Sequence, residues 1–255
     1  MMLKTIFSEW TKLISTKAIY WTTALFFALC AGTAALMGWN TVPQPQLFNI
    51  PILYASAAVL AVNTFGLFIV SIQAIMVFTA EYRHNYASVT FAATPQRIQV
   101  VVAKWLVYSF FAAVMTFITT ISCFYIAKWA ASEEASKTLI VWSDDNALRL
   151  MWVLPLVIVL MVTFSQGVAL IVRQTAGAVA LMSMWILALE NIVGLLPKIG
   201  PWVVKYGPMS NMQAFVQRTD IQDIVWGYQG SGLYFAVWSL AILILGTVMV
   251  KLRDA

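Results

Sequence analysis

The most constraining feature of this sequence is a stretch of 63 residues, from Ala18 to Ala80, that contains no Asp, Glu, Lys or Arg. A helix rises about 1.5 Å per residue and the hydrocarbon core of a membrane is about 30 Å thick, so roughly 20 apolar residues cross it once. The stretch is therefore long enough for two crossings joined by a turn. The prolines between Trp39 and Pro51 mark the expected turn.

Four further charge-free windows are each close to the length of one membrane helix. Only 10% of the residues are charged, against about 25% in soluble proteins. The sequence therefore predicts an all-α integral membrane protein that forms a single transmembrane domain over residues 1–255. The six predicted spans are Ala18–Met37, Ile52–Ala80, Trp105–Ala127, Leu150–Val172, Thr175–Leu196 and Gly230–Val250.

The distribution of charge orients these predicted spans. If the amino terminus is inside, the inner segments hold nine basic and three acidic side chains, and the outer segments hold six basic and seven acidic ones. Because cytoplasmic segments carry an excess of Lys and Arg, both termini are expected in the cytoplasm. The basic residues are scattered along the membrane edges, where anionic lipid attracts them, so the net charge of +5 does not indicate a nucleic-acid partner.

Residues 1–17 predict an amphipathic helix that lies on the membrane lipid. Its apolar side chains recur every three or four residues, and polar side chains take the other side. A cleaved signal peptide is the alternative, but the apolar run that follows is too long and lacks a small-residue cleavage pattern. The helix is either a passive anchor or an elbow that touches a cytoplasmic subunit, and its apolar residues include Phe7, Trp10, Leu13 and Ile14.

Residues 81–104 form the longest inner connection, which is too apolar for a solvated tether. Thr94 followed by Pro95 is a helix-start signal, so the third span is expected to begin early, in the cytoplasm. Ahead of this signal, residues 81–94 can form a short helix across the inner surface. The alternative is that their aromatic side chains are ordinary interfacial residues.

These segments resemble the permease subunit of a bacterial type-2 ATP-binding-cassette (ABC) exporter. The resemblance rests on SEWTKL before the first span, EYRHN after the second, and AATPQR and AK before the third. It implies that residues 1–17 are the elbow helix, that 81–94 hold the coupling helix seated on an ATPase, and that 197–229 form an outer gate of short re-entrant helices. By position, the residues that face the ATPase would be Glu81, Tyr82, Arg83, Asn85 and Tyr86.

An exporter of this family needs partners. The chain has no Gly-Lys dipeptide and hence no phosphate-binding GxxxxGK[ST] loop, so we expect no cofactor on it, and ATP and Mg on a separate ABC-type ATPase in two copies. Six spans make half of such a pathway, which implies a second permease subunit, identical or homologous. Small residues let helices approach closely. Those on the first span pack either a dimer or the monomer, and they include Ala24, Ala28 and Gly32.

Glu190 is the one acid that falls within a predicted span. An ionised side chain in the membrane is costly and usually faces protein or water. Glu190 is therefore a candidate for gating or substrate contact, and the alternative is a structural bond to neighbouring backbone or an interfacial position. The other pathway candidates, each of which could equally form an interhelical hydrogen bond, are Asn63, Gln73, Thr119 and Gln166.

The sequence does not favour an enzyme. The single histidine, His84, lies in the inner loop, so a histidine metal cluster or a Ser-His pair cannot be built in the membrane. The leading hypothesis is a permease subunit of the bacterial cell membrane that dimerises, couples to ATPase subunits and moves an amphipathic or hydrophobic substrate outward. The alternatives are an ion-driven carrier or channel that works without an ATPase, and a sensor or scaffold that does not transport.

Overall fold

A computed structural model of the protein describes residues 2–44, 50–83 and 97–252, with the backbone alone at 44, 81–83 and 97. Within these ranges, six helices are long and apolar enough to cross a membrane. The prediction of a helical, multi-pass membrane protein is confirmed at this level. The candidate spans are Lys17–Trp39, Val62–Ala80, Ile98–Ala130, Asp145–Val172, Thr175–Gly194 and Gly227–Leu252.

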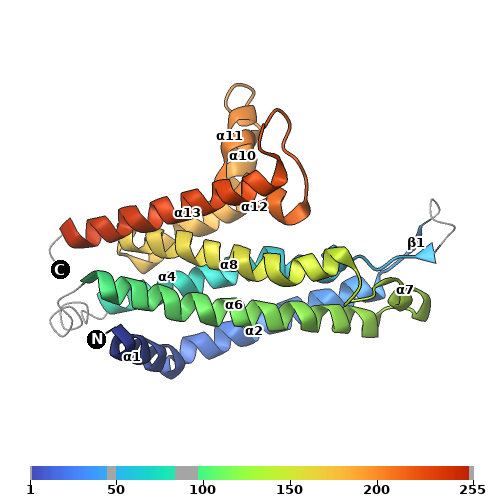
Figure 1. Ribbon diagram of the computed structural model, residues 1–255, viewed down its shortest axis with the longest axis horizontal. Helices are drawn as coiled ribbons and strands as arrows, with labels where there is room; N and C mark the ends of the chain where they lie inside the picture. The colour runs from blue at the N-terminus through green and yellow to red at the C-terminus, as the bar shows by residue number, and fades with distance from the viewer. Residues whose placement is uncertain (1, 45–49, 84–96, 253–255) are drawn as a thin grey trace. The chain divides into compact units, whose positions relative to one another are not determined.

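The chain divides into two compact units. Unit 1 comprises residues 1–15, 70–110 and 159–255, and unit 2 comprises residues 16–69 and 111–158. The elements in chain order (Figure 1) are α1 (Met2–Ser15), α2 (Lys17–Trp39), β1 (Pro43–Gln44), β2 (Ile50–Pro51), α3 (Ala55–Ala58), η2 (Val62–Gly66), α4 (Leu67–Arg83), α6 (Arg97–Ala130), α7 (Glu133–Thr138), α8 (Asp145–Val172), α9 (Thr175–Met184), η3 (Trp185–Leu189), α10 (Glu190–Gly194), α11 (Gly200–Tyr206), α12 (Pro208–Gln217) and α13 (Gly227–Leu252).

The second predicted span is interrupted near its start. The sequence predicts one helix from Ile52 to Ala80, but α3 is followed by a break at Val59 and by the π-helical turn η2 before α4 begins. The turn η2 packs closely on α2 within unit 2. A Cβ added at Gly66 would lie 2.8 Å from the ring of Phe26, so η2 brings a backbone without a side chain against α2.

Side-chain hydrogen bonds tie the loops of unit 2 together. The strands β1 and β2 pair antiparallel, with Pro43 opposite Pro51. The Thr138 hydroxyl at the end of α7 accepts a hydrogen bond of 2.9 Å from the backbone N–H of Leu53. Lys128 donates to the carbonyl of Leu139 at 2.7 Å. These bonds give the connection between the third and fourth spans a fixed structure, including a helix, α7, that the sequence did not predict.

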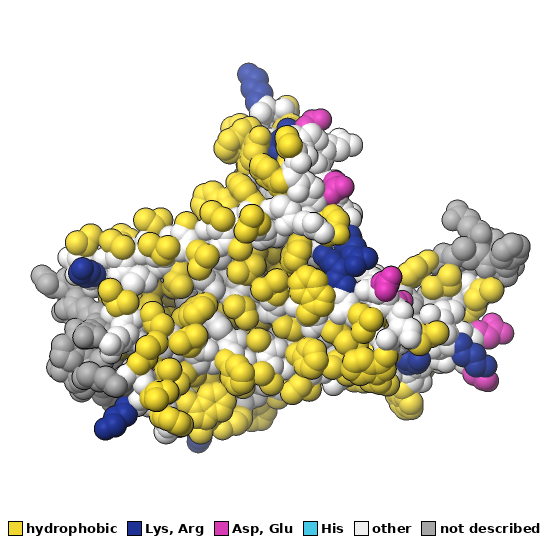
Figure 2. All heavy atoms as spheres, in the orientation of Figure 1, with side chains coloured by type: hydrophobic (Ala, Val, Ile, Leu, Met, Phe, Trp, Pro, Cys, Tyr) yellow, Lys and Arg dark blue, Asp and Glu magenta, His cyan; other side chains and the backbone are white. Residues whose placement is uncertain are grey.

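In unit 1, two glycines let α8 and α13 approach closely. A Cβ at Gly167 would lie 2.6 Å from the backbone carbonyl carbon of Ile242, and one at Gly246 would lie 2.7 Å from the carbonyl oxygen of Gly167. The buried share is 72% for the α8 span and 22% for the α13 span. Hydrophobic side chains cover the visible face of α13 in Figure 2, which leaves this side of the helix for lipid.

The leader forms α1, which is fixed to unit 1 by a buried ion pair. Glu9 is 5% exposed, and its carboxylate accepts from Lys104 of α6 at 2.5 Å and from Lys12 at 2.7 Å. The Lys104 ammonium also lies 6.0 Å from the centre of the Phe78 ring on α4. Lys104 is therefore the point at which α1, α4 and α6 meet.

The orientation of α1 differs from the prediction in two residues. The sequence places Glu9 on the water-facing side and Leu13 on the lipid side, but both are buried. Glu9 can be buried because Lys104 neutralises it, and this contact turns part of the polar side toward the protein. Phe7, Trp10 and Ile14 remain exposed.

Unit 1 has two distinct ends (Figure 1). One end, the α1 end, holds α1, the end of α4, the start of α6 and the last turn of α13. At the other end, where α13 begins, lie the short helices α10, α11 and α12, which we call the short-helix end. The family resemblance treats α1 as an inner helix and α11 and α12 as outer helices. These helices lie at opposite ends of unit 1.

Candidate functional site

The short-helix end is built by prolines and glycines. Pro201 and Pro208 stand in the first turns of α11 and α12, where a missing N–H has no cost. A Cβ at Gly200 would lie only 2.1 Å from the carbonyl oxygen of Gly194, so the end of α10 and the start of α11 touch backbone to backbone. The segment after the fifth span therefore folds back on itself as short helices.

Glu190 is the centre of this region. It is 6% exposed, and its carboxylate accepts four hydrogen bonds. One oxygen accepts from the indole N–H of Trp185 and from the backbone N–H of Met209, both at 2.9 Å. The other accepts from the backbone N–H of Ser210 at 2.7 Å and from its hydroxyl at 2.8 Å. We call this arrangement the Glu190 clamp.

The clamp supplies the cap that α12 lacks. The residue before α12 is Gly207, which has no side chain to bond the free N–H groups of the first turn. Glu190 takes that role from α10, and its negative charge lies at the positive end of the α12 dipole. A Cβ at Gly207 would meet the Glu190 carboxylate at 2.3 Å, so glycine is needed here for the acid to approach.

The π-helical turn η3 brings Trp185 to the clamp. Hydrogen bonds in a π-helix join residues five apart, and Trp185 and Glu190 have this spacing. The Trp185 ring packs edge to face on Phe164 of α8 at 5.3 Å, and Phe164 stacks on Phe235 of α13 at 6.4 Å. The clamp is thereby in contact with the fourth and sixth spans.

The side-chain amide of Asn211 stabilises the junction of α11 and α12. Asn211 is fully buried, and its side-chain amide donates to the carbonyls of Lys205 at 3.1 Å and Gly207 at 2.9 Å. The hydroxyl of Tyr234 on α13 donates to the carbonyl of Tyr206 at 2.9 Å. The short helices are therefore held to one another and to the last span by polar contacts as well as by apolar packing.

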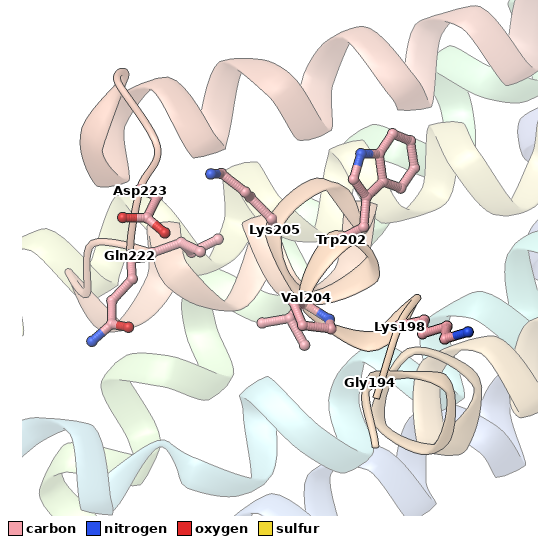
Figure 3. A pocket seen from close by; sticks show the side chains of 9 residues that line it. Gly194, Lys198, Trp202, Val204, Lys205, Gln222 and Asp223 are labelled. Atoms are coloured by element: carbon pink, nitrogen blue, oxygen red, sulfur yellow. The ribbon is translucent and has the colours of Figure 1, made fainter. Parts of the chain in front are cut away.

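A cleft of about 680 Å³ opens against α11 and the loop before α13 (Figure 3). The ammonium group of Lys205 extends toward the loop that carries Gln222 and Asp223, and Lys198 lies at the other end of the cleft. The remaining lining is largely apolar: Gly194, Pro201, Trp202, Val204 and Ile221. The cleft offers two positive charges and one negative charge next to an apolar wall.

One of the predicted pathway residues, Gln73, forms a hydrogen bond between two helices of unit 1. Gln73 of α4 is fully buried and accepts a bond of 2.7 Å from the hydroxyl of Tyr108 on α6. The sequence predicts either a pathway role or an interhelical hydrogen bond for Gln73, and this contact is such a bond. A parallel bond joins the indole of Trp105 to the hydroxyl of Thr163 on α8 at 2.9 Å.

The other pathway candidates are not brought together. Thr119 is buried and bonds the carbonyl of Met115 in its own helix at 2.7 Å. Asn63 is half-buried on η2 in unit 2. Gln166 of α8 is fully buried, and neither its amide oxygen nor its nitrogen has a hydrogen-bond partner among the described residues.

Gln166→Met is expected to raise the free energy of unfolding by about 1–3 kcal/mol, because it removes a buried polar group without a bond and keeps the volume similar. Thermal unfolding of the purified protein in detergent measures this change. The matched control is Gln73→Met, which deletes the bond from Tyr108 and should destabilise the protein. If Gln166→Met is less stable than the wild type, the amide has a partner in the native membrane.

The small residues of the first span face outward. Ala24, Ala28 and Gly32 of α2 are exposed, and a Cβ at Gly32 would meet nothing within 4 Å. The buried side of α2 carries Phe26 and Cys30 instead. The face is therefore open to another helix or to lipid, and its use in a dimer stays a prediction.

The predicted ATPase-facing residues lie outside the part of the chain whose side chains are described. Glu81, Tyr82 and Arg83 end α4 as backbone, and Asn85 and Tyr86 fall in residues 84–96, outside the described ranges. The coupling helix predicted over 81–94 therefore stays a prediction.

A scan against protein-family models finds no match for the chain, and a search of curated proteins finds no match either.

Sequence reasoning singled out Glu190 but missed its partners. Trp185, Met209 and Ser210 are separated from it by 5, 19 and 20 residues, and no periodicity connects them. A signal was nevertheless present at Gly207 and Pro208. A helix that begins with proline after a glycine has no capping side chain of its own, so an acceptor from elsewhere in the chain can take that role.

Proposed function

We propose that the chain is the permease subunit of a bacterial type-2 ABC exporter. It pairs with a second permease subunit and moves an amphipathic or hydrophobic substrate outward when two separate ATPase subunits bind and hydrolyse ATP. The chain itself is not an enzyme in this proposal, and ATP and Mg belong to the ATPase. Both termini lie in the cytoplasm, at the α1 end.

The observation that carries the proposal is the meeting of α1, α4 and α6 at Lys104. The buried bond from Lys104 to Glu9 holds α1 against the base of α6, and Phe78 places α4 at the same point. An exporter driven by a separate ATPase needs a rigid surface at the end where the ATPase docks. A helix fixed by a buried ion pair beside the ends of two spans is suited to transmit a movement of the docked ATPase to those spans.

The short-helix end supports the same proposal. Helices that fold back before the last span, held by the Glu190 clamp, are suited to close a pathway at the opposite end of unit 1. Trp185 and Phe164 join the clamp to the fourth span, so a movement of α8 would reach it. An ion-driven carrier instead needs an ionisable group that binds and releases its ion, and the Glu190 carboxylate is occupied by four protein hydrogen bonds.

Tyr82→Ala together with Arg83→Glu is expected to weaken ATPase docking by about 2 kcal/mol or more, because an aromatic and an arginine are typical anchors of an interface. The measurement is ATP hydrolysis by the ATPase that co-purifies with the tagged chain, and ATP-driven uptake of a lipophilic dye in proteoliposomes. Insertion and folding of the permease should be unchanged.

Two outcomes would contradict this proposal. Unchanged coupling in the double variant would reject the assignment of residues 81–86 as the docking segment. Dye transport by the permease alone, driven by an ion gradient, would support the carrier alternative. Lys137→Gln, which changes an exposed lysine of α7, serves as the control for a charge change elsewhere.

A further inference from the structure

The hairpin of α10 and α11 carries large apolar side chains that no other described part of the chain covers. Leu195 is 83% exposed, Trp202 is 66% exposed, and Leu196, Ile199 and Val204 are also exposed. So many large apolar side chains within ten residues form a patch of the kind that marks an interaction site. In a membrane protein the natural environment of such a patch is lipid.

A cluster of aromatic side chains determines the position of this hairpin along the axis of α13. Trp202 packs on Tyr206 at 4.9 Å, Tyr206 on Trp226 at 6.3 Å, and Trp226 stacks on Tyr234 at 5.4 Å. Trp226 comes directly before α13, and Tyr234 lies about 10 Å along it. Since α13 has 26 residues and is about 39 Å long, its ends reach beyond a hydrocarbon core of about 30 Å.

Trp and Tyr gather where the membrane meets water. The cluster therefore places the hairpin at the level of the lipid headgroups, with its apolar patch against the acyl chains. In Figure 1 α10 and α11 stand across α13, so the candidate span Thr175–Gly194 turns away from the direction of α13 at its α10 end.

The cleft beside α11 has the charges that a lipid headgroup needs. Neither Lys198 nor Lys205 forms an ion pair with any residue of the described ranges, and Asp223 and Gln222 complete the polar lining. Lysines at a membrane surface attract anionic lipid. A carboxylate and an amide accept hydrogen bonds from hydroxyl groups.

We propose that this cleft binds the headgroup of an anionic phospholipid with free hydroxyls, of the phosphatidylglycerol class. The phosphate lies at the Lys205 ammonium, and Lys198 adds a second positive charge at the other end of the cleft. The headgroup hydroxyls donate to Asp223 and Gln222, and the acyl chains follow Leu195 and Ile199. The site goes beyond the proposed transport function, because lipid binding here requires neither an ATPase nor a substrate.

The lipid selectivity is tested by native mass spectrometry of the full chain released from nanodiscs of mixed phosphatidylglycerol and phosphatidylcholine. The wild type is expected to retain phosphatidylglycerol in preference. Lys198→Gln together with Lys205→Gln should reduce that preference by roughly fivefold for each lysine and about thirtyfold for the pair. Lys137→Gln is the matched control and should leave it unchanged. Equal retention in the double variant and the wild type would overturn the proposal.

Two further measurements separate lipid from other occupants. Inorganic phosphate in excess should not release the retained lipid, and release would mean that the cleft takes free phosphate. A nitroxide on Leu195→Cys, with Cys30→Ala and Cys123→Ala, should be relaxed by oxygen more than by a water-soluble nickel reagent in phosphatidylglycerol vesicles. Access by the nickel reagent equal to that at Lys137→Cys, or shielding from both reagents by a second copy, would overturn the proposal.

Discussion

Lys104→Met is expected to lower the free energy of unfolding by about 3–5 kcal/mol, because it leaves the buried carboxylate of Glu9 without its closest partner. Both groups are nearly inaccessible, with 3% exposure for Lys104 and 5% for Glu9. The remaining partner of Glu9 is Lys12, whose side chain is 44% exposed. Denaturation of the purified protein in detergent by increasing dodecyl sulfate measures the change.

The structure provides a matched control on the same carboxylate. Lys12→Met removes the exposed partner of Glu9 and is expected to cost about 1 kcal/mol or less. The double variant Glu9→Leu with Lys104→Met should recover most of the loss, because a buried ion pair can often be replaced by apolar residues. If Lys104→Met and Lys12→Met cost the same, then α1 is not anchored by Lys104.

Glu190→Gln is expected to lower the free energy of unfolding by about 3 kcal/mol or more. Each hydrogen bond to a charged group contributes about 1.5–3 kcal/mol. Glutamine has one acceptor oxygen, and its NH2 group would replace one of the two carboxylate oxygens. It would then face either the Trp185 and Met209 donors or the two Ser210 donors, so about two of the four bonds are lost. Hydrogen exchange at the Met209 or Ser210 amide should accelerate before exchange in the spans does.

Asn191→Gln is the control for the clamp, because it changes the exposed neighbour of Glu190 on α10 and should leave exchange in α12 unaltered. Unchanged exchange at Met209 and Ser210 in Glu190→Gln would contradict the capping role. Transport by the folded variant answers a separate question. A wild-type rate would assign Glu190 to stability alone, whereas a reduced rate with intact spans would support its role in gating.

The spans could be predicted from the sequence because membrane insertion depends on local composition. The bounds of Lys17–Trp39, Asp145–Val172 and Gly227–Leu252 lie within a few residues of those of the predicted spans Ala18–Met37, Leu150–Val172 and Gly230–Val250. A helix in lipid satisfies its backbone hydrogen bonds internally, so length and apolar character suffice to define it. The break after α3 was missed because the residues around Val59 are as apolar as the rest of the window, and the close contact of Gly66 with Phe26 joins residues 40 apart in the sequence.

Of the residues that form the Glu190 clamp, only Glu190 itself could be predicted from the sequence. Glu190 stood out because an acid within an apolar window is costly, but its donors were chosen by the π-helical turn η3 and by the return of α12. Glu9 was assigned to the water-facing side because it falls among the polar residues of the amphipathic pattern in residues 1–17. Glu9 is buried because it pairs with Lys104, which is 95 residues away in the sequence.

The sequence alone determined that this protein consists of apolar helices long enough to cross a membrane, the approximate bounds of most of them, and that Glu190 is an exceptional acid, since each of these properties follows from the free energy of moving a local segment into lipid. The tertiary structure decided what the buried acids do. Glu9 became an anchor and Glu190 a helix cap because the cost of burying a charge is offset only by partners that the folded chain brings from elsewhere.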